Sequence, residues 1–287
     1  MSLAAVRDPA LVPVSTARGE SPADFTPERC IELIRTAVGD STADVRLLTR
    51  MPFTMIAEVA STFRAGNGFL VGDSAHRMTP AGALGMNTAI QSAHNLGWKL
   101  AWVARGWAGD TLLDSYHAER KPAGERNARR SLQLREVPPQ ADDWTIDLDQ
   151  RYTSAVIAQA GPRQHGVLPG QRAPHAWVST GGRRHSLLDL FDGRLTLIVG
   201  PDADAWRTAA AASPVPLQVL GPGRELVCDT DLLARRYGLA HGGAVLVRPD
   251  GHVAWTCTRA IEPVAQLLAA LDQTLGRVGD QLFAASA

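Results

Sequence analysis

The segment "FLVGDSAHRMTPAGALGMNTAIQSAHNLGWKL", residues 69–100, constrains the fold of this chain more than any other stretch. Its beginning, within "GFLVGD", predicts a short apolar strand that ends at Gly72-Asp73. A loop that contains Gly82 and Gly85 follows, and a helix is predicted from about Asn87 to Arg105. This order of strand, glycine-rich loop and helix is typical of α/β folds that bind a ligand at the loop.

The loop offers a ligand three different kinds of contact. Asp73, at the end of the predicted strand, can accept hydrogen bonds from ligand hydroxyls. Pro80, Gly82 and Gly85 limit side-chain bulk, so the backbone can approach a flat or anionic group. A helix that begins near Asn87 directs free N–H groups and its positive dipole end at the same ligand. The residues therefore indicate a nucleotide-like cofactor site, with one alternative left open: a glycine-rich turn whose Asp73 caps the next helix.

A resemblance to a known family favours the cofactor site. The segment resembles the second flavin-binding motif of the FAD-dependent aromatic hydroxylases, the para-hydroxybenzoate hydroxylase superfamily. The matching residues are Gly72-Asp73-Ser74-Ala75-His76, Pro80, Gly82-Ala83-Leu84-Gly85-Met86-Asn87, and further on Trp98-Lys99-Leu100, Leu112-Leu113-Asp114-Ser115-Tyr116 and Glu119-Arg120. The sequence departs from the family at Thr79, where many relatives have a second proline.

The resemblance implies roles for individual residues. Asp73 would bond a ribityl hydroxyl of FAD, and Pro80 would lie beside the isoalloxazine ring. Backbone groups around Gly85, Met86 and Asn87 would meet the pyrimidine edge of the ring, where the helix dipole favours negative charge. The complete predicted cofactor-binding set is Gly72, Asp73, Pro80, Gly82, Leu84, Gly85, Met86 and Asn87. We expect His76 to be structural, and the sequence identifies neither a catalytic base nor a metal site.

Other helices and strands can be predicted before and after this segment. A helix is predicted at residues 26–39, with Thr26 as its N-cap, and one or two strands at residues 44–60. The helix after the loop should bury one apolar face, and a second helix should run from Asp110 past Pro122. Residues 151–158 alternate like a strand. The predicted inner face of the first long helix consists of Ala89, Ala93, Leu96, Leu100 and Val103.

The last part of the chain predicts a compact α/β domain of its own. Strands are predicted at residues 194–200 and 217–221, helices at 202–212, 231–239 and 261–276, and a hairpin at 243–257. This order, with "PGQRAPHAWV" before it, resembles the thioredoxin-like C-terminal domain of polyketide-type and phenol-type hydroxylases. "LIVGPDADAW" lacks the CxxC of a redox-active thioredoxin, so we expect a structural or dimer-supporting role. His175, His185, His241 and His252 are too scattered to predict a metal site.

The Gly-x-Gly-x-x-Gly fingerprint of a dinucleotide-binding fold is not found in the sequence. "GNGFLVG", residues 66–72, has the wrong glycine spacing and precedes a strand instead of following one. We therefore expect an N-terminally incomplete chain: an α/β, partial FAD-binding domain that lacks its dinucleotide fold, followed by the thioredoxin-like domain. The predicted parts are residues 1–57 (a remnant of the substrate domain), 58–160 (the C-terminal part of the FAD-binding domain) and 165–287 (thioredoxin-like). Apolar surface should be exposed where the dinucleotide fold would pack.

Composition excludes several classes of partner. Lys plus Arg equals Asp plus Glu at 29 each, so no net field attracts nucleic acid. No apolar run reaches the length of a membrane span. Cys30, Cys228 and Cys257 lie far apart in the sequence, which predicts a reducing compartment and a cytoplasmic protein.

The resemblance implies an FAD-dependent monooxygenase. NAD(P)H would reduce FAD, and one oxygen atom of O2 would enter an aromatic or polyketide-like substrate. Two alternatives stay open: a non-catalytic chain that pairs with a separate flavin-binding half, and a flavin-independent cyclase or isomerase that reuses the pocket. The expected assembly is a homodimer or that pairing.

Overall fold

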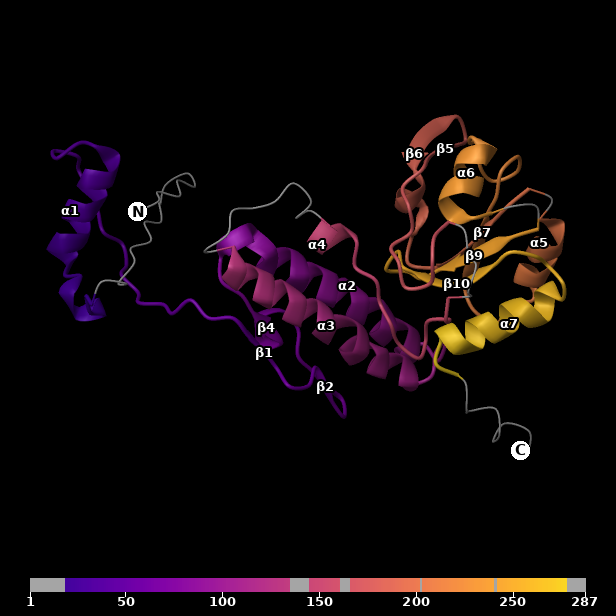
Figure 1. The fold of residues 1–287 in the computed structure, drawn as a ribbon, viewed down its shortest axis with the longest axis horizontal. Coiled ribbons are helices and arrows are strands. Elements are labelled where there is room, and N and C mark those ends of the chain that lie inside the picture. The colour runs from indigo at the N-terminus through magenta and orange to yellow at the C-terminus, as the bar shows by residue number, and fades with distance from the viewer. Residues whose placement is uncertain (1–18, 135–144, 161–165, 202, 240–241, 278–287) are drawn as a thin grey trace. The chain divides into compact units, whose positions relative to one another are not determined.

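The computed structural model describes residues 19–134, 145–160, 166–201, 203–239 and 242–277 (Figure 1). The chain divides into two compact units, residues 1–55 and residues 56–287. Each unit is described by itself. Their Pro and Gly content predicts linkers at residues 137–144 and 161–175; the first of these, residues 161–165 of the second, and His241 lie outside the described residues.

The first unit contains a short 3-10 helix, η1 (Pro22–Asp24), and the helix α1 (Pro27–Val38). The prediction of α1 is confirmed at both ends. The Thr26 side chain caps it by accepting a hydrogen bond from the Arg29 N–H at 3.3 Å. Gly39 ends it in the left-handed conformation, at φ 79°. Of the one or two strands predicted at residues 44–60, the structure has only β1 (Glu58–Val59), which belongs to the second unit; residues 44–57 form no strand.

The second unit begins with four two-residue strands in two antiparallel pairs. Strand β1 pairs with β4, and β2 pairs with β3. Their bounds are β1 (Glu58–Val59), β2 (Arg64–Ala65), β3 (Gly68–Phe69) and β4 (His76–Arg77). The strand predicted to end at Asp73 is therefore shorter than expected. Strand β3 ends at Phe69, and Gly72–Ser74 forms a 3-10 turn, η2.

Two long antiparallel helices lie side by side in the middle of this unit (Figure 1). They are α2 (Leu84–Ala104) and α3 (Thr111–Gln133). Helix α2 begins at Leu84, three residues before the predicted start, after the 3-10 turn η3 (Ala81–Ala83). As predicted, α3 continues through Pro122, which supplies no backbone N–H to the helix.

The predicted inner face of α2 is wrong. Of its five residues only Leu96 is buried, while Ala93 and Leu100 are exposed. The buried face instead carries polar side chains between Leu84 and the Trp98–Trp102 turn, namely Thr88, Ser92, Asn95 and Lys99. They are buried because α3 offers each of them a hydrogen-bond partner, and burial of satisfied polar groups is affordable.

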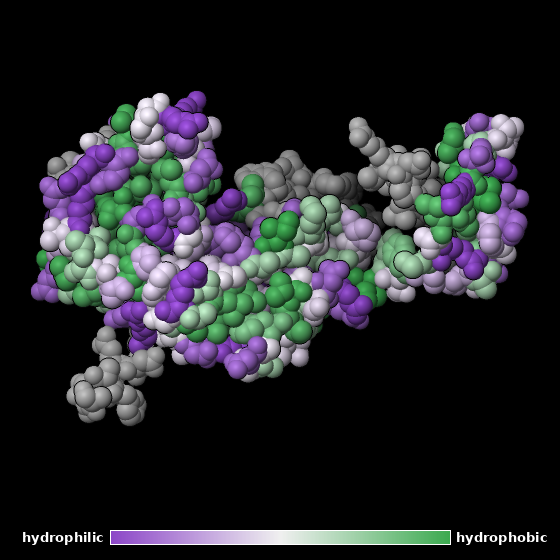
Figure 2. Space-filling view, turned by 180° about the vertical axis from the view of Figure 1, so that it is seen from behind, coloured by the Kyte–Doolittle hydropathy of each residue, from purple (hydrophilic) through white to green (hydrophobic). Residues whose placement is uncertain are grey.

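The opposite side of α2 forms an exposed apolar stripe. It is defined here as Met86, Ile90, Ala93, Gly97 and Leu100, spaced by four, three, four and three residues. Met86 is 71% exposed and Ile90 is 60% exposed. Hydrophobic residues gather on one face of the second unit in Figure 2. The stripe exposes apolar side chains at helical spacing, and the packing of a dinucleotide fold on such surface stays a prediction.

A four-stranded sheet forms the centre of the last part of the chain. Its strand order is β10-β9-β7-β8, with β7 and β8 parallel and the other pairs antiparallel. The strands are β7 (Leu195–Val199), β8 (Leu217–Leu220), β9 (Ala244–Val247) and β10 (Val253–Cys257). The helices are α5 (Asp204–Ala211), α6 (Thr230–Tyr237) and α7 (Pro263–Thr274). All seven predicted elements, and the mixed α/β class, are confirmed.

The sequence did not predict a second hairpin in this part. It consists of β5 (Trp177–Thr180) and β6 (Arg183–Ser186), followed by the 3-10 turn η4 (Leu187–Leu190). The strand predicted at residues 151–158 is wrong. After the short helix α4 (Thr145–Leu148), this segment buries Tyr152, Val156 and Ile157 without pairing.

Two apolar cores lie on the two faces of the sheet. Side chains of β7 and β9 alternate between them, so that Leu197 and Leu246 face one core and Ile198 and Val245 face the other. The first core also contains Trp98 and Trp102 of α2 and Leu112 of α3. The helical pair and the sheet therefore share one core. Among the described residues, no helix is long and apolar enough to cross a membrane.

Candidate functional site

The η2 turn positions the predicted acid. Gly72 adopts φ 60°, and its carbonyl accepts a hydrogen bond from the Ala75 N–H at 2.9 Å. A Cβ atom at Gly72 would lie 3.6 Å from the Cβ of Ala89, so the turn packs against the first turns of α2. Asp73, the next residue, is exposed and free to meet a ligand.

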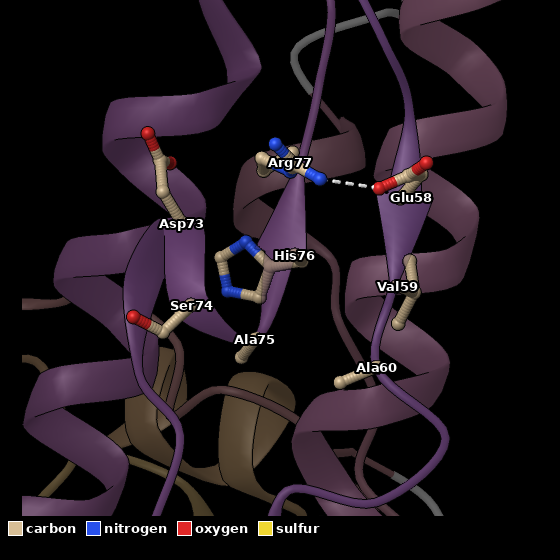
Figure 3. A pocket seen from close by; sticks show the side chains of 8 residues that line it. All are labelled: Glu58, Val59, Ala60, Asp73, Ser74, Ala75, His76 and Arg77. Carbon is tan, nitrogen blue, oxygen red and sulfur yellow. Dashed lines mark hydrogen bonds and ion pairs between the residues drawn. The ribbon is translucent and has the colours of Figure 1, made fainter.

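An open pocket of ≈ 490 Å³ lies between this turn and strand β1 (Figure 3). It is lined by Glu58, Val59, Ala60, Asp73, Ser74, Ala75, His76 and Arg77. The ring of His76 lies between the Asp73 turn and β1. An ion pair of 2.5 Å joins Arg77 of β4 to Glu58 of β1, and both residues line the pocket. Acceptors and small residues in one hollow suit a ligand that carries several hydroxyls.

The second half of the loop forms the beginning of α2. Gly82 (φ 79°) and Ala83 (φ 54°) both adopt left-handed conformations and turn the chain into the helix. The N-cap position of α2 is Ala83, whose side chain makes no capping hydrogen bond, so the alternative in which Asp73 caps this helix is wrong. A Cβ atom at Gly85 would meet no atom within 4 Å. Uncapped N–H groups beside open space give this helix end the properties of a site for a flat, partly anionic group.

The predicted residues fall into three places. Asp73 lines the pocket, and Gly72 packs the turn on α2. Leu84 is buried, so that only its backbone is available to a ligand. The remaining members of the predicted set are exposed or half-buried at the start of α2 and do not line the pocket: Pro80, Gly82, Gly85, Met86 and Asn87.

Helix α3 holds the loop from beneath. Thr79 donates through its backbone N–H to Ser131 Oγ at 3.2 Å and through its hydroxyl to the Ser131 carbonyl at 2.7 Å. The Asn127 amide donates to Thr88 Oγ1 at 2.9 Å. Thr79 is the position at which the sequence departs from the family, and its hydroxyl supplies an anchor that proline lacks.

His76 is buried, with 1% of its surface exposed. Its Nε2 lies 3.2 Å from Ser92 Oγ, and its Nδ1 has no hydrogen-bond partner among the described residues. Burial, and then the charge of Arg120, lower the pKa of His76, so the ring is neutral at neutral pH. The prediction of a structural His76 is consistent with its contact to Ser92, but the pocket position was not expected.

A buried ionic cluster joins the helical pair to the β9–β10 turn. It consists of Lys99, Glu119, Arg248 and Asp250, whose side chains are at most 3% exposed. Lys99 Nζ lies 2.8 Å from Glu119 Oε2, and Arg248 donates to both Glu119 oxygens at 2.7 and 2.9 Å. Asn95 bridges the acids, donating to Glu119 at 2.7 Å and to Asp250 at 3.2 Å.

All four groups of the cluster are charged at neutral pH. Burial alone would raise the pKa of Glu119, but the charges of Arg248 and Lys99 outweigh it and hold the pKa far below its usual range. Burial would raise the pKa of Asp250 as well, but the charge of Arg248 outweighs it and holds this pKa well below its ordinary value. Burial lowers the pKa of Lys99 to about 8, which still leaves the amine protonated. The sequence did not predict this cluster. Its signal was two charged residues, Lys99 and Glu119, at positions on the faces by which the two helices pack together.

The chain matches two known families in succession. Residues 4–131 match the family described as FAD binding domain, and residues 166–278 match the family described as aromatic-ring hydroxylase, C-terminal. The first match contains the whole loop, α2 and most of α3, and the second contains the four-stranded sheet.

Similar proteins include several that are named as hydroxylases or monooxygenases. A putative polyketide hydroxylase of Streptomyces halstedii is 43% identical over 275 residues, which cover 84% of this chain and 49% of that protein. Tetracenomycin A2 monooxygenase-dioxygenase of Streptomyces glaucescens is 38% identical, over 91% of this chain and 50% of that protein. The crystal structure of a ternary complex of aklavinone-11 hydroxylase with FAD and aklavinone has a TM-score of 0.84 at 34% identity, covering 92% of this chain and 54% of that one.

The chain thus spans about half the length of the relatives that it matches. The two family matches lie in the order that the sequence predicted, with the loop in the first. The chain belongs to the FAD-dependent aromatic-ring hydroxylases of the polyketide hydroxylase type.

Proposed function

We propose that this chain forms the ribityl and ring side of an FAD site in an aromatic-ring monooxygenase that uses NAD(P)H. The observation that carries the proposal is the uncapped start of α2 beside an exposed Asp73, on a turn that packs against the same helix. These groups fit the two chemistries of a flavin, because an acid matches a polyol and a helix N-terminus matches an electron-rich ring edge.

Each of the predicted residues has a role in this proposal. Asp73 accepts a hydrogen bond from a ribityl hydroxyl, within the pocket that it lines. Pro80 lies beside the ring, and backbone groups around Gly85, Met86 and Asn87 face its pyrimidine edge. Gly72, Gly82 and Leu84 shape the backbone, two by positive φ and one by burying its side chain beneath the loop.

The bound flavin would supply the hydride and oxygen chemistry, and the chain would supply electrostatics and position. The dipole of α2 stabilises negative charge at the ring edge, and bare backbone at Gly85 lets the ring approach closely. The proposed substrate is an aromatic or polyketide ring, on the strength of relatives named polyketide hydroxylase and tetracenomycin A2 monooxygenase-dioxygenase. No described side chain has the geometry to be assigned as a catalytic base.

We also propose that the chain works in an assembly, as a homodimer or together with a separate flavin-binding half. The exposed stripe of α2 supports this, because apolar side chains at helical spacing are normally covered. The sheet order with parallel β7 and β8 supports a thioredoxin-like C-terminal domain. The three separate, free cysteines support a cytoplasmic location.

Titration of the purified chain with FAD, followed by flavin fluorescence, tests the proposal. We expect saturable binding, weakened about 10- to 100-fold in Asp73→Asn, because a hydrogen bond to a charged group contributes about 1.5–3 kcal/mol. Asp149→Asn, at an exposed acid outside the pocket, is the matched control and should bind like the wild type. Equal affinities of the wild type and Asp73→Asn would refute the assigned site, and absence of binding would refute the function.

A further inference from the structure

Arg120 is a fully buried cation without a carboxylate partner. Its exposed fraction is 0%, and among the described residues no acid lies within ion-pair distance of its guanidinium. Its hydrogen-bond acceptors within the described part of the chain are all neutral: the Thr88 carbonyl at 3.1 Å, Ser92 Oγ at 3.1 Å, Gln150 Oε1 at 2.7 Å and the Tyr152 hydroxyl at 2.9 Å. Burial of a charge without a counter-ion costs several kcal/mol, so such a group calls for an explanation beyond packing.

The contacts of Arg120 reach both ends of the loop, one directly and the other through Ser92. Nη2 donates to the carbonyl of Thr88, in the first turns of α2. Nε donates to Ser92 Oγ, which in turn contacts Nε2 of His76, next to the Asp73 turn. One planar side chain therefore joins the entry of the loop to its exit. A planar guanidinium can donate in several fixed directions at once, which a lysine amine or a glutamine amide cannot do.

The same contacts favour one tautomer of His76. The Nε–H of Arg120 can only donate, so Ser92 Oγ accepts from it. We expect Ser92 to donate its single hydroxyl hydrogen to His76 Nε2. A neutral ring that accepts at Nε2 carries its hydrogen at Nδ1. The chain Arg120–Ser92–His76 therefore orders three side chains from α3, α2 and β4.

The backbone of α3 also limits how the ring of His76 can move. A Cβ atom at Gly124 would lie 3.4 Å from both Cβ and Cδ2 of His76, so the ring rests directly on the α3 backbone. Replacement of the loop's other support, the Thr79–Ser131 pair, would leave this contact unchanged, because it lies farther along α3.

We propose that Arg120 is the positioning residue of the flavin loop: it ties the start of α2 to His76, and so fixes Asp73 and the uncapped helix end in one geometry. This inference rests on the proposed function for the identity of the ligand. The contacts that join Arg120 to Thr88, and through Ser92 to His76, are here called the clamp, and they exist without a ligand. The charge is retained because only a guanidinium meets all four acceptors. Loss of the clamp would loosen the loop while the apolar core that α2 and α3 share with the sheet stays intact.

The experiment compares Arg120→Lys with Arg129→Lys, an exposed position on the same helix, in the full chain. Two quantities are measured on the folded proteins: the FAD dissociation constant, and the tautomer of His76 from its ring ¹⁵N shifts without FAD. We expect Arg120→Lys to bind FAD at least ~10-fold more weakly and to lose the single Nδ1–H tautomer. Arg129→Lys should change neither quantity.

A second variant keeps the test decisive if Arg120→Lys does not fold. Ser92→Ala removes one hydroxyl and leaves Arg120 three acceptors, so it should fold, lose the fixed tautomer and weaken FAD binding several-fold. An unchanged tautomer together with an unchanged dissociation constant in a folded variant overturns the inference. If the wild type binds no FAD, the proposed function fails, and the tautomer measurement alone decides whether the clamp exists.

Discussion

Two glycines of the same loop differ in what a side chain would meet. Gly82 has φ 79°, and a Cβ atom there would lie 2.4 Å from Leu134 Cδ1. Gly85 lies in the first turn of α2, with open space where its side chain would be. The backbone conformation therefore requires glycine at position 82. At position 85 the protein itself leaves room for a side chain, so we attribute that glycine to the flavin ring of the proposed site.

Substitution of each glycine by alanine separates folding from binding. We expect Gly82→Ala to lower the free energy of unfolding by about 1–2 kcal/mol, because alanine is strained in the left-handed region. Gly85→Ala should leave stability unchanged or raise it by up to about 1 kcal/mol, since alanine favours helix, yet weaken FAD binding. Urea denaturation and flavin titration measure the two effects. A Gly85→Ala variant with wild-type affinity would place the ring elsewhere.

At this scale the sequence was informative where its signals are local. The loop, its glycines and its acid could be located because their spacing in the chain is itself the pattern. The clamp could not, because Arg120 and Ser131 reach the loop from positions 32 and 52 residues away from their partners Thr88 and Thr79. Nothing in the sequence around Arg120 distinguishes a buried arginine from a solvated one.

At the scale of elements, α2 and α3 show why periodicity failed. Both helices bury polar side chains toward each other, and α2 leaves an apolar stripe outside. A rule that turns apolar residues inward therefore selects the wrong face of α2. The C-terminal elements were predicted correctly because their strands, such as the fully buried β7, are continuous apolar runs bounded by glycine and proline.

The ionic cluster between these helices and the β9–β10 turn predicts acid lability. The folded-state pKa values of Glu119 and Asp250 are depressed below their ordinary values of 4.5 and 3.8. Their contribution to stability is therefore complete above those values and is lost as the pH falls below them. We expect the free energy of unfolding to decrease from pH 6 to pH 3, by up to about 1.4 kcal/mol per pH unit for each proton taken up.

Glu119→Gln should change both the level and the slope of that curve. At pH 7 we expect a loss of about 3–5 kcal/mol, because Arg248 and Lys99 would be left buried with a neutral partner. The slope below pH 5 should become shallower, since one carboxylate no longer titrates. Glu125→Gln, which removes only the partly exposed pair with Lys121, serves as control and should change stability by less than about 1 kcal/mol. Parallel curves for Glu119→Gln and the wild type would contradict this account.

At the scale of the whole molecule, the exposed stripe of α2 predicts association. We expect Ile90→Lys to raise the dissociation constant of any self-association at least ~10-fold, because it buries an amine in an apolar contact. His94→Lys introduces the same side chain at an exposed position beside the stripe and should have little effect. Sedimentation velocity over a range of protein concentrations measures both. Identical profiles for Ile90→Lys and the wild type would show that self-association does not use this face.

The shared core makes residues 56–287 one compact unit, although two families match it in succession. The sequence could predict the two family segments but not their common core, because Trp98 and Trp102 carry no sign of the sheet that they meet. Long-range packing of this kind depends on the arrangement in space, which a local pattern does not contain.

The contact between Glu119 and Arg248 also constrains how such proteins can be recombined. A chimaera could import a C-terminal half from a distant relative that has no arginine at the position of Arg248. Glu119 and Asn95 would then be buried between the two halves without the guanidinium that neutralises Glu119 here. Grafting of that half alone should therefore fail where grafting together with α2 and α3 succeeds. The contact therefore couples the two family segments across the boundary between them.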